Sequence, residues 1–146
     1  MTNPTARKFG YPQSLVAETA SWLVLARPAQ PTLGALVLVC KEPAEAFSQI
    51  SPAAFADLGE AVRGVERVLG EAVAYQKINY LMLMMVDPDV HFHVLPRYEG
   101  SREFEGLSFP DNGWPGQPQW SPAVDLPPPA LYALAQRLAS LWTTGR

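Results

Sequence analysis

The stretch "DPDVHFHVLPRY", residues 87–98, decides the fold and holds both histidines of the chain. Polar and apolar residues alternate in its first half, which is the pattern of a β-strand with one buried face. Because side chains alternate between the two faces of a strand, Asp89, His91 and His93 share one face. The two imidazoles then stand about 7 Å apart on a stiff backbone, facing a surface or a cleft.

Three interpretations of this polar face follow from the residue types. It is a solvated strand face without a role, or a metal site in which Asp89, His91 and His93 supply three ligands. The third is covalent catalysis, in which one imidazole attacks a phosphorus centre and its neighbour handles a proton. The spacing alone does not separate the metal site from catalysis.

The apolar runs around this stretch predict an antiparallel sheet of about five strands. The turn before the third strand carries two prolines and a glycine, and Pro96 is expected to close the last strand. The expected strands cover residues 14–19, 21–26, 35–41, 76–85 and 90–96, with the turn at 27–34.

Two helices complete an α+β fold. The clearest covers residues 51–73, with Ser51 as N-cap and Pro52 at the first helical position. The second covers residues 129–142. Apolar residues recur at spacings of three or four in the first helix and define its expected buried face: Phe55, Leu58, Val62, Val65, Leu69 and Val73.

We expect a single domain over residues 1–146, in which residues 98–146 are a Pro/Trp-rich C-terminal extension followed by the second helix. The alternative for the extension is disorder. Its tryptophans, Trp114 and Trp120, favour an ordered segment that wraps the domain, because indole rings are costly to leave in water.

The composition excludes several classes of protein. A net charge of -3 argues against binding to nucleic acid, and no apolar run reaches the roughly 18 residues of a membrane span. Cys40 is the single cysteine and lies in an apolar run. With one cysteine no disulfide can form within the chain, so a cytoplasmic location is expected. The first residues show no secretory signal. Only 17% of residues are charged, against about 25% in an average domain, which favours a dimer interface.

The histidine stretch resembles the signature of the histidine triad (HIT) family of nucleotide hydrolases and transferases. That signature reads His-x-His-x-His-x-x and often continues into Pro-Arg. Upstream, "WLVLARPAQPTLGALVLVC" (22–40) is similar to the family's strand-turn-strand element, and "KINYLMLMMVDPDVHFHVLPRY" (77–98) is similar to the pattern that closes its fold. The resemblance covers residues 21–100.

The resemblance implies a homodimer, formed through the long helix and a central strand, that binds a small nucleotide. His91 matches the middle histidine, which attacks the α-phosphate and forms a nucleotidyl-histidine intermediate. His93 matches the third histidine, which stabilises developing charge on the phosphate. Asp89 and Arg97 are the candidate nucleotide-binding residues; the alternative for Arg97 is an exposed arginine that ends the strand. No cofactor and no resident metal ion are expected, although a divalent ion can accompany the substrate.

Three positions depart from the family pattern. Asp89 replaces the first histidine, Ala35 replaces an upstream histidine, and Met85 stands where the family has an asparagine. Asp89 keeps its backbone carbonyl, which in the family orients the nucleophilic ring, but its carboxylate would raise the pKa of a nearby imidazole and repel a phosphate. Two hypotheses therefore stand: an enzyme acting through His91, or a nucleotide-binding protein with little or no turnover.

Overall fold

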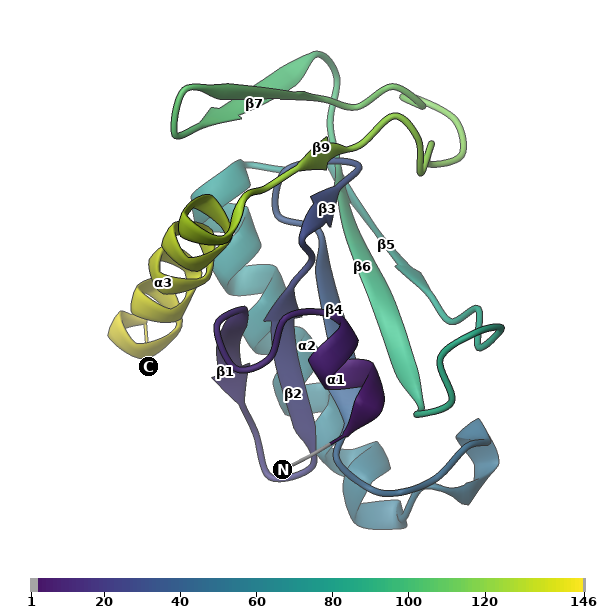
Figure 1. Ribbon diagram of the computed structural model, residues 1–146. Helices are drawn as coiled ribbons and strands as arrows, with labels where there is room; N and C mark the ends of the chain where they lie inside the picture. Colours follow the sequence, from purple (N-terminus) through teal and green to yellow (C-terminus); the bar gives the residue numbers. More distant parts are fainter. Residues whose placement is uncertain (1–2, 146) are drawn as a thin grey trace.

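The computed structural model describes residues 3–145. Their helices and strands are α1 (Pro4–Lys8), β1 (Leu15–Glu18), β2 (Trp22–Ala26), β3 (Ala29–Gln30), β4 (Leu36–Cys40), the 3₁₀ helix η1 (Phe47–Gln49), α2 (Pro52–Val73), β5 (Lys77–Leu81), β6 (His91–Arg97), β7 (Ser101–Phe104), β8 (Leu107–Pro110), β9 (Val124–Asp125) and α3 (Pro128–Thr144). An antiparallel five-stranded sheet, in the order β1-β2-β4-β6-β5, forms the centre (Figure 1). The α+β class, the five strands and both predicted helices are confirmed.

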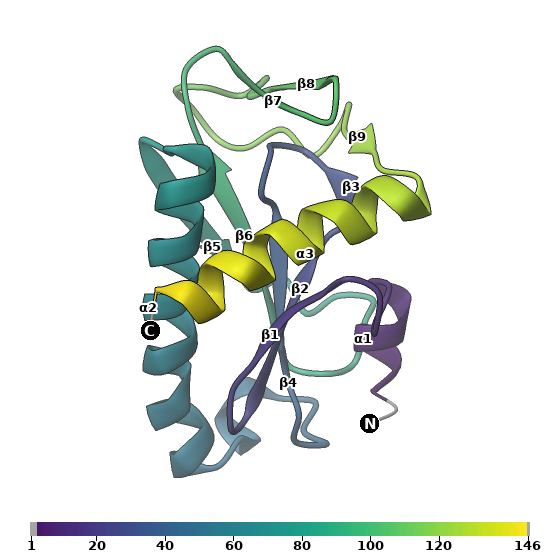
Figure 2. The same ribbon diagram turned by 90° about the vertical axis from the view of Figure 1, so that its left-hand side faces the viewer.

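Apolar side chains cover both faces of the central strands. Every residue of β2 and β4 is buried, as their continuous apolar sequences require. One face packs against α2 and α3, and α3 crosses β1 to reach α2. The opposite face is covered by the N-terminal segment, and Figure 2 shows α1 on the far side of the sheet from α2.

Helix α2 begins as the sequence predicts. The Ser51 hydroxyl accepts a hydrogen bond of 3.1 Å from the backbone N–H of Ala54. The predicted buried face was wrong at Phe55, which is 44% exposed and packs on Phe47 with ring centroids 5.3 Å apart. The seam against the sheet passes through the small residues Ala54 and Ala61 instead, so the buried stripe is rotated by about one residue.

The two strands that lead into and through the histidine stretch have different ends from those predicted. β5 stops at Leu81, and three residues later Met84 adopts a left-handed backbone with φ 53°, outside the β region. β6 continues through Pro96 to Arg97, so Pro96 does not close it. β6 pairs with β4 as far as Val94. Pro96 lies beyond the last pair, and it has no backbone N–H with which to continue the hydrogen bonds to β4.

The C-terminal extension contains β7, β8, β9 and α3. It forms the β7–β8 hairpin and then returns along the domain, where β9 pairs with β3, a short strand inside the predicted turn. Tyr98 fixes the start of the extension, because its hydroxyl donates to the Phe109 carbonyl (2.8 Å) and accepts from the Leu33 N–H (2.7 Å). Among the described helices, none has the length and apolar character that crossing a membrane requires.

Candidate active site

Strand β6 presents both histidines on the face of the sheet opposite α2. His91 lies beside Val39 of β4, and His93 lies between Val37 of β4 and Leu81 of β5. Phe92, between the histidines, points to the other face and packs against Trp22, as the alternation predicts. The two imidazole centroids are 5.1 Å apart and the rings are nearly perpendicular.

The His91 ring is oriented by the backbone two residues before it. Its Nδ1 lies 2.7 Å from the Asp89 carbonyl oxygen. A carbonyl oxygen only accepts hydrogen bonds, so the contact requires a proton on Nδ1. In the neutral ring Nε2 is then the nitrogen with a free electron pair. Asp89 therefore supplies the carbonyl contact that the first histidine of the motif was expected to supply.

The side chain of Asp89 is turned toward the N-terminal helix. Its Oδ2 accepts hydrogen bonds from the backbone N–H (3.2 Å) and the hydroxyl (2.9 Å) of Thr5, which lies in α1. Asn3 caps this helix by accepting from the Ala6 N–H, and Lys8 forms an ion pair with Asp87. The carboxylate therefore anchors α1 over the histidine face.

The anchored segment places Phe9 directly against the histidines. The Phe9 ring centroid lies 6.4 Å from that of His91 and 5.7 Å from that of His93. On another side, the Trp120 ring of the C-terminal extension meets His93 edge to face at 5.3 Å. The histidine face is consequently almost covered, with His91 2% and His93 7% exposed.

His93 is a neutral imidazole near pH 7. Burial, the nearby Arg27 guanidinium and His91 together lower the pKa of His93 to about 4. Its Nδ1 is buried and has no hydrogen-bond partner within residues 3–145. A buried ring nitrogen without a partner is costly, and a bound ligand would remove that cost.

An opening of about 220 Å³, which we call the histidine hollow, lies beside the two rings. Ligand pockets usually measure about 300–1,000 Å³, so this space takes part of a nucleotide but not a whole one without movement. The hollow is lined by side chains from α1, the end of β2, the β5–β6 loop and β6: Lys8, Phe9, Arg27, Leu83, Met84, Met85, Val86, Asp87, His91 and His93.

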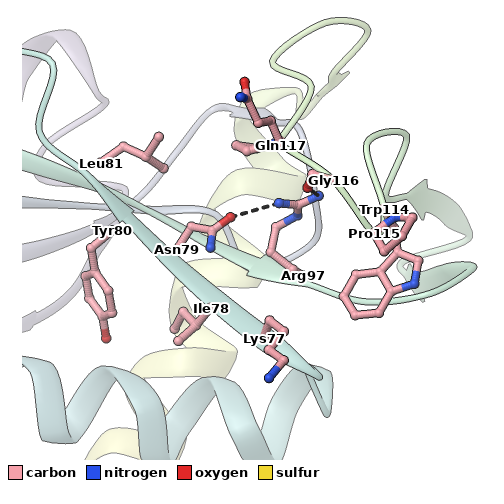
Figure 3. Close-up of a pocket in the computed structure, with 11 residues that line it drawn as sticks. Lys77, Ile78, Asn79, Tyr80, Leu81, Arg97, Trp114, Pro115, Gly116 and Gln117 are labelled. Carbon is pink, nitrogen blue, oxygen red and sulfur yellow. Dashed lines mark hydrogen bonds between the residues drawn. The ribbon is translucent and has the colours of Figure 1, made fainter.

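Arg97, predicted to bind nucleotide, lies further along β6 and does not line the histidine hollow. Its guanidinium forms a two-pronged ion pair with Asp111 (2.8 and 3.1 Å) and also donates to Asn79 and to the Gly116 carbonyl. Figure 3 shows it at the wall of a larger cavity of about 700 Å³ along β5 and the Trp114–Pro118 segment, which we call the edge cavity. The structure therefore brings Asp89, His91 and His93 together and places Arg97 in another pocket.

The other departures from the motif lie in different surroundings. Ala35 is fully buried before β4, and Met85 is 84% exposed at the rim of the histidine hollow. Within residues 3–145, no group of three or more His, Cys, Asp or Glu side chains is arranged to hold a metal ion.

Sequence reasoning missed Phe9, Arg27 and Trp120 around the histidines. A signal for the N-terminal helix was present, because Asn3 followed by Pro4 is a typical N-cap and first helical residue. The arrival of Trp120 beside His93 depends on the path of the extension, and no local pattern encodes that path.

The fold and the paired histidines on β6 define a histidine triad domain. A family model of the HIT domain matches residues 11–100, so the chain belongs to the HIT family. A comparison with curated proteins finds no match.

Solved structures of histidine triad proteins share the fold over nearly the whole chain. A histidine triad protein from Sinorhizobium meliloti 1021 is 21% identical with a TM-score of 0.73, and the match covers 96% of this chain and 95% of that one. One from Marinobacter aquaeolei VT8 is 20% identical with a TM-score of 0.70, covering 89% and 88%. Diadenosine triphosphate hydrolase from Plasmodium falciparum is 9% identical with a TM-score of 0.67, covering 91% and 78%. These similarities establish the fold that the chain shares with them.

Proposed function

We propose that this chain is a HIT-type nucleotide hydrolase or nucleotidyl transferase in which Nε2 of His91 attacks an α-phosphate. The observation that carries the proposal is the 2.7 Å contact between His91 Nδ1 and the Asp89 carbonyl. In the neutral ring this contact makes Nε2 the nitrogen with the free electron pair that a nucleophile requires, although the first histidine of the motif is absent. The diadenosine triphosphate hydrolase among the structural neighbours supports a substrate of the nucleotide class.

The proposed reaction has two steps. First, the electron pair of Nε2 bonds to the α-phosphorus, while the bond from phosphorus to the leaving oxygen or nitrogen breaks. The leaving group departs with that electron pair and takes a proton from solvent. Second, the oxygen of water or another acceptor bonds to phosphorus and loses a proton, the phosphorus–nitrogen bond breaks, and His91 is regenerated.

His93 is proposed to stabilise the phosphate during both steps. A neutral imidazole carries one N–H, and its pKa of about 4 keeps this ring neutral at pH 7. A hydrogen bond from a fixed donor to the developing charge contributes about 10²–10³ in rate at comparable sites. We therefore expect His93→Ala to lower kcat by that factor.

A second candidate function is nucleotide binding with little or no turnover. The observation in its favour is the small size of the histidine hollow, about 220 Å³, with Phe9 packed against both histidines. If the N-terminal segment rarely moves, a nucleotide does not reach Nε2 of His91 in the right position.

One experiment separates the two functions. Wild type, His91→Ala and the surface control Arg63→Gln are incubated with adenosine phosphoramidate, diadenosine polyphosphates and nucleotide sugars. The enzyme hypothesis predicts that His91→Ala lowers kcat/KM by at least about 10³ and that Arg63→Gln leaves it unchanged. It also predicts that wild type treated with an α-labelled substrate carries an acid-labile label on His91. If wild type turns over no substrate faster than His91→Ala, the enzyme hypothesis fails, and calorimetry with AMP tests binding alone.

We also propose a homodimer formed along β5 and α2. Among residues 3–145, no strand pairs with the outer side of β5, which lies at an edge of the sheet, so that side of its backbone could pair with a second copy. Beside it, an apolar depression of about 220 Å³ lies between the sheet and α2, lined by Leu38, Leu58, Val62, Tyr80 and Phe92.

Sedimentation velocity tests this assembly. Wild type is expected to sediment as a dimer and Leu58→Glu, which places a charge in the apolar depression, as a monomer. Tyr132→Glu, on the exposed face of α3, is the control and should remain dimeric. A wild type that is monomeric at tens of micromolar would contradict the proposal.

A further inference from the structure

The N-terminal segment, residues 3–9, covers the histidines but lies outside the residues that the HIT family model matches. Helix α1 within it has five residues, and the match begins at residue 11. Gly10, between the segment and the match, has a φ of 91°, in the left-handed region that glycine adopts without strain. The segment is therefore a short cover that joins the matched domain through a glycine.

Polar contacts hold this segment against the ends of two strands. The hydroxyl and the N–H of Thr5 donate to the carboxylate of Asp89, two residues before β6, at 2.9 and 3.2 Å. The side-chain amide of Asn3 donates to the carbonyl of Cys40, the last residue of β4, at 3.2 Å. A helix of five residues has no stability of its own, so α1 stays over the histidines only while such contacts hold it.

The apolar part of this contact is small. Of residues 3–9, Ala6 and Phe9 belong to the apolar cluster on this face of the sheet. The sheet contributes four residues from β2 and β4 to the same cluster: Leu23, Leu25, Val37 and Val39. Terminal segments with few apolar contacts open locally at a lower free energy than the core.

In the closed arrangement the proposed nucleophile is out of reach of a nucleotide. His91 is 2% exposed, Phe9 packs against its ring, and the histidine hollow measures about 220 Å³. Two of the walls, β2 and β6, are paired with strands on both sides and are fixed in the sheet. The wall that α1 and Phe9 form is held by the contacts described above, so it is the wall that a ligand can displace.

We propose that residues 3–9 form an autoinhibitory lid, which closes the histidine hollow and moves away about Gly10 to admit the substrate. The inference rests on the proposed function for the identity of the ligand. Asp89, which replaces the first motif histidine, supplies the acceptor that latches the lid. Lid closure and nucleotide binding exclude each other, so each weakens the other by the same factor.

Chemical modification of the histidines tests the lid without any nucleotide. Diethyl pyrocarbonate acylates neutral imidazole, and His91 and His93 are the only histidines of the chain. The proteins are wild type, the two latch variants Thr5→Val and Asn3→Ala, and the control Thr143→Val. Neither latch residue lines the histidine hollow, and Thr143 is exposed near the end of α3. Thermal unfolding of each variant establishes that it is folded.

The latch variants should be modified faster than wild type. A hydrogen bond to a charged group contributes about 10-fold or more, so Thr5→Val should raise the open fraction, and with it the rate of modification, by that factor. Asn3→Ala should also react faster, and Thr143→Val should react as wild type does. Unchanged rates in both latch variants would overturn the inference, because they would mean that another wall of the hollow moves.

AMP then tests whether the lid competes with a nucleotide. Calorimetry should give a dissociation constant about 10-fold lower in Thr5→Val than in wild type, because the closed fraction of molecules reduces the apparent affinity. Saturating AMP should speed hydrogen exchange of the α1 amides in wild type, whereas a fixed wall of the site would exchange more slowly. Exchange that is unchanged or slower with AMP, or binding no tighter in Thr5→Val, would overturn the inference. If AMP binds to none of these proteins, the proposed function fails, and the modification rates still decide whether residues 3–9 are a lid.

Discussion

The ion pair between Arg97 and Asp111 predicts a large loss of stability when its negative charge is removed. The Asp111 carboxylate accepts four hydrogen bonds, two from Arg97 (2.8 and 3.1 Å) and one each from the backbone N–H groups of Tyr98 (3.1 Å) and Gly113 (3.2 Å). The side chains of the pair are only 4% and 1% exposed. In Asp111→Asn the Arg97 charge stays buried without its counter-charge, which typically costs about 3–5 kcal/mol.

For a chain of this length, each kcal/mol lowers Tm by about 2–4 °C, so we expect a decrease of about 6–20 °C. Circular dichroism during thermal and urea unfolding measures it. Arg97→Met in the same chain as Asp111→Asn should recover about 1–3 kcal/mol, because no unpaired charge is left. The control, Glu60→Gln, breaks the exposed pair with Arg63 and should change stability by less than about 0.5 kcal/mol.

Acid should act on the same pair. Burial opposes the charged form of Asp111, but the hydrogen bonds from Arg97 and the backbone outweigh it and lower the pKa of Asp111. The unfolded chain binds this proton at higher pH, so the contribution is complete at neutral pH and is lost as pH falls below about 4. A cost below about 1 kcal/mol for Asp111→Asn, or no recovery in the double variant, would refute a structural role for Arg97.

Three further predictions concern the N-terminal segment, His93 and the helix packing. Thr5→Val removes the hydrogen bond from the Thr5 hydroxyl to the Asp89 carboxylate and should speed hydrogen exchange of the α1 amides about 10-fold or more. Unchanged exchange would argue that Asp89 does not anchor α1. NMR titration should show that His93 stays uncharged until the pH falls to about 4. The unfolded chain takes up this proton near pH 6.5, so the free energy of unfolding should decrease as the pH falls from 6.5 to 4. A His93 that titrates near pH 6.5 would contradict its burial. Gly64→Ala places a Cβ 2.2 Å from a carbon of Trp142 and should cost about 1–3 kcal/mol in urea unfolding, whereas Gly59→Ala meets only open space and a flexible arginine and should be neutral or stabilising.

Local sequence patterns were sufficient for the sheet and for the long helix. β2 and β4 are short continuous apolar runs, and such runs fit strands that are buried on both faces. Ser51 and Pro52 marked the first turn of α2 because their preferences are properties of the helix end itself. The alternation in β6 likewise placed both histidines on one face before any tertiary contact was known.

The surroundings of the histidines could not be predicted in the same way, because distant segments provide them. Thr5 and Asp89 are 84 residues apart, and neither residue alone indicates that they bond. Trp120 and Arg27 meet only because β9 pairs with β3 and brings the extension back over the domain. The wrong end of the strand predicted over residues 76–85 has a different origin, since a continuous apolar run predicts a strand even where the backbone turns into a loop, as it does at Met84.

On the proposed mechanism, the replacement of the first motif histidine by Asp89 affects access to the site more than it affects the proposed nucleophile, His91. The atom that orients His91 is the backbone carbonyl of residue 89, and every residue type supplies one. The carboxylate of Asp89 does not line the histidine hollow, where it would repel a phosphate, because its oxygen accepts from the N–H and the hydroxyl of Thr5. Those bonds hold Phe9 against both imidazoles, so on the proposed mechanism substrate binding competes with the docking of the N-terminal helix. The identity of residue 89 would then set how often the site opens, and the free electron pair on His91 would remain the same.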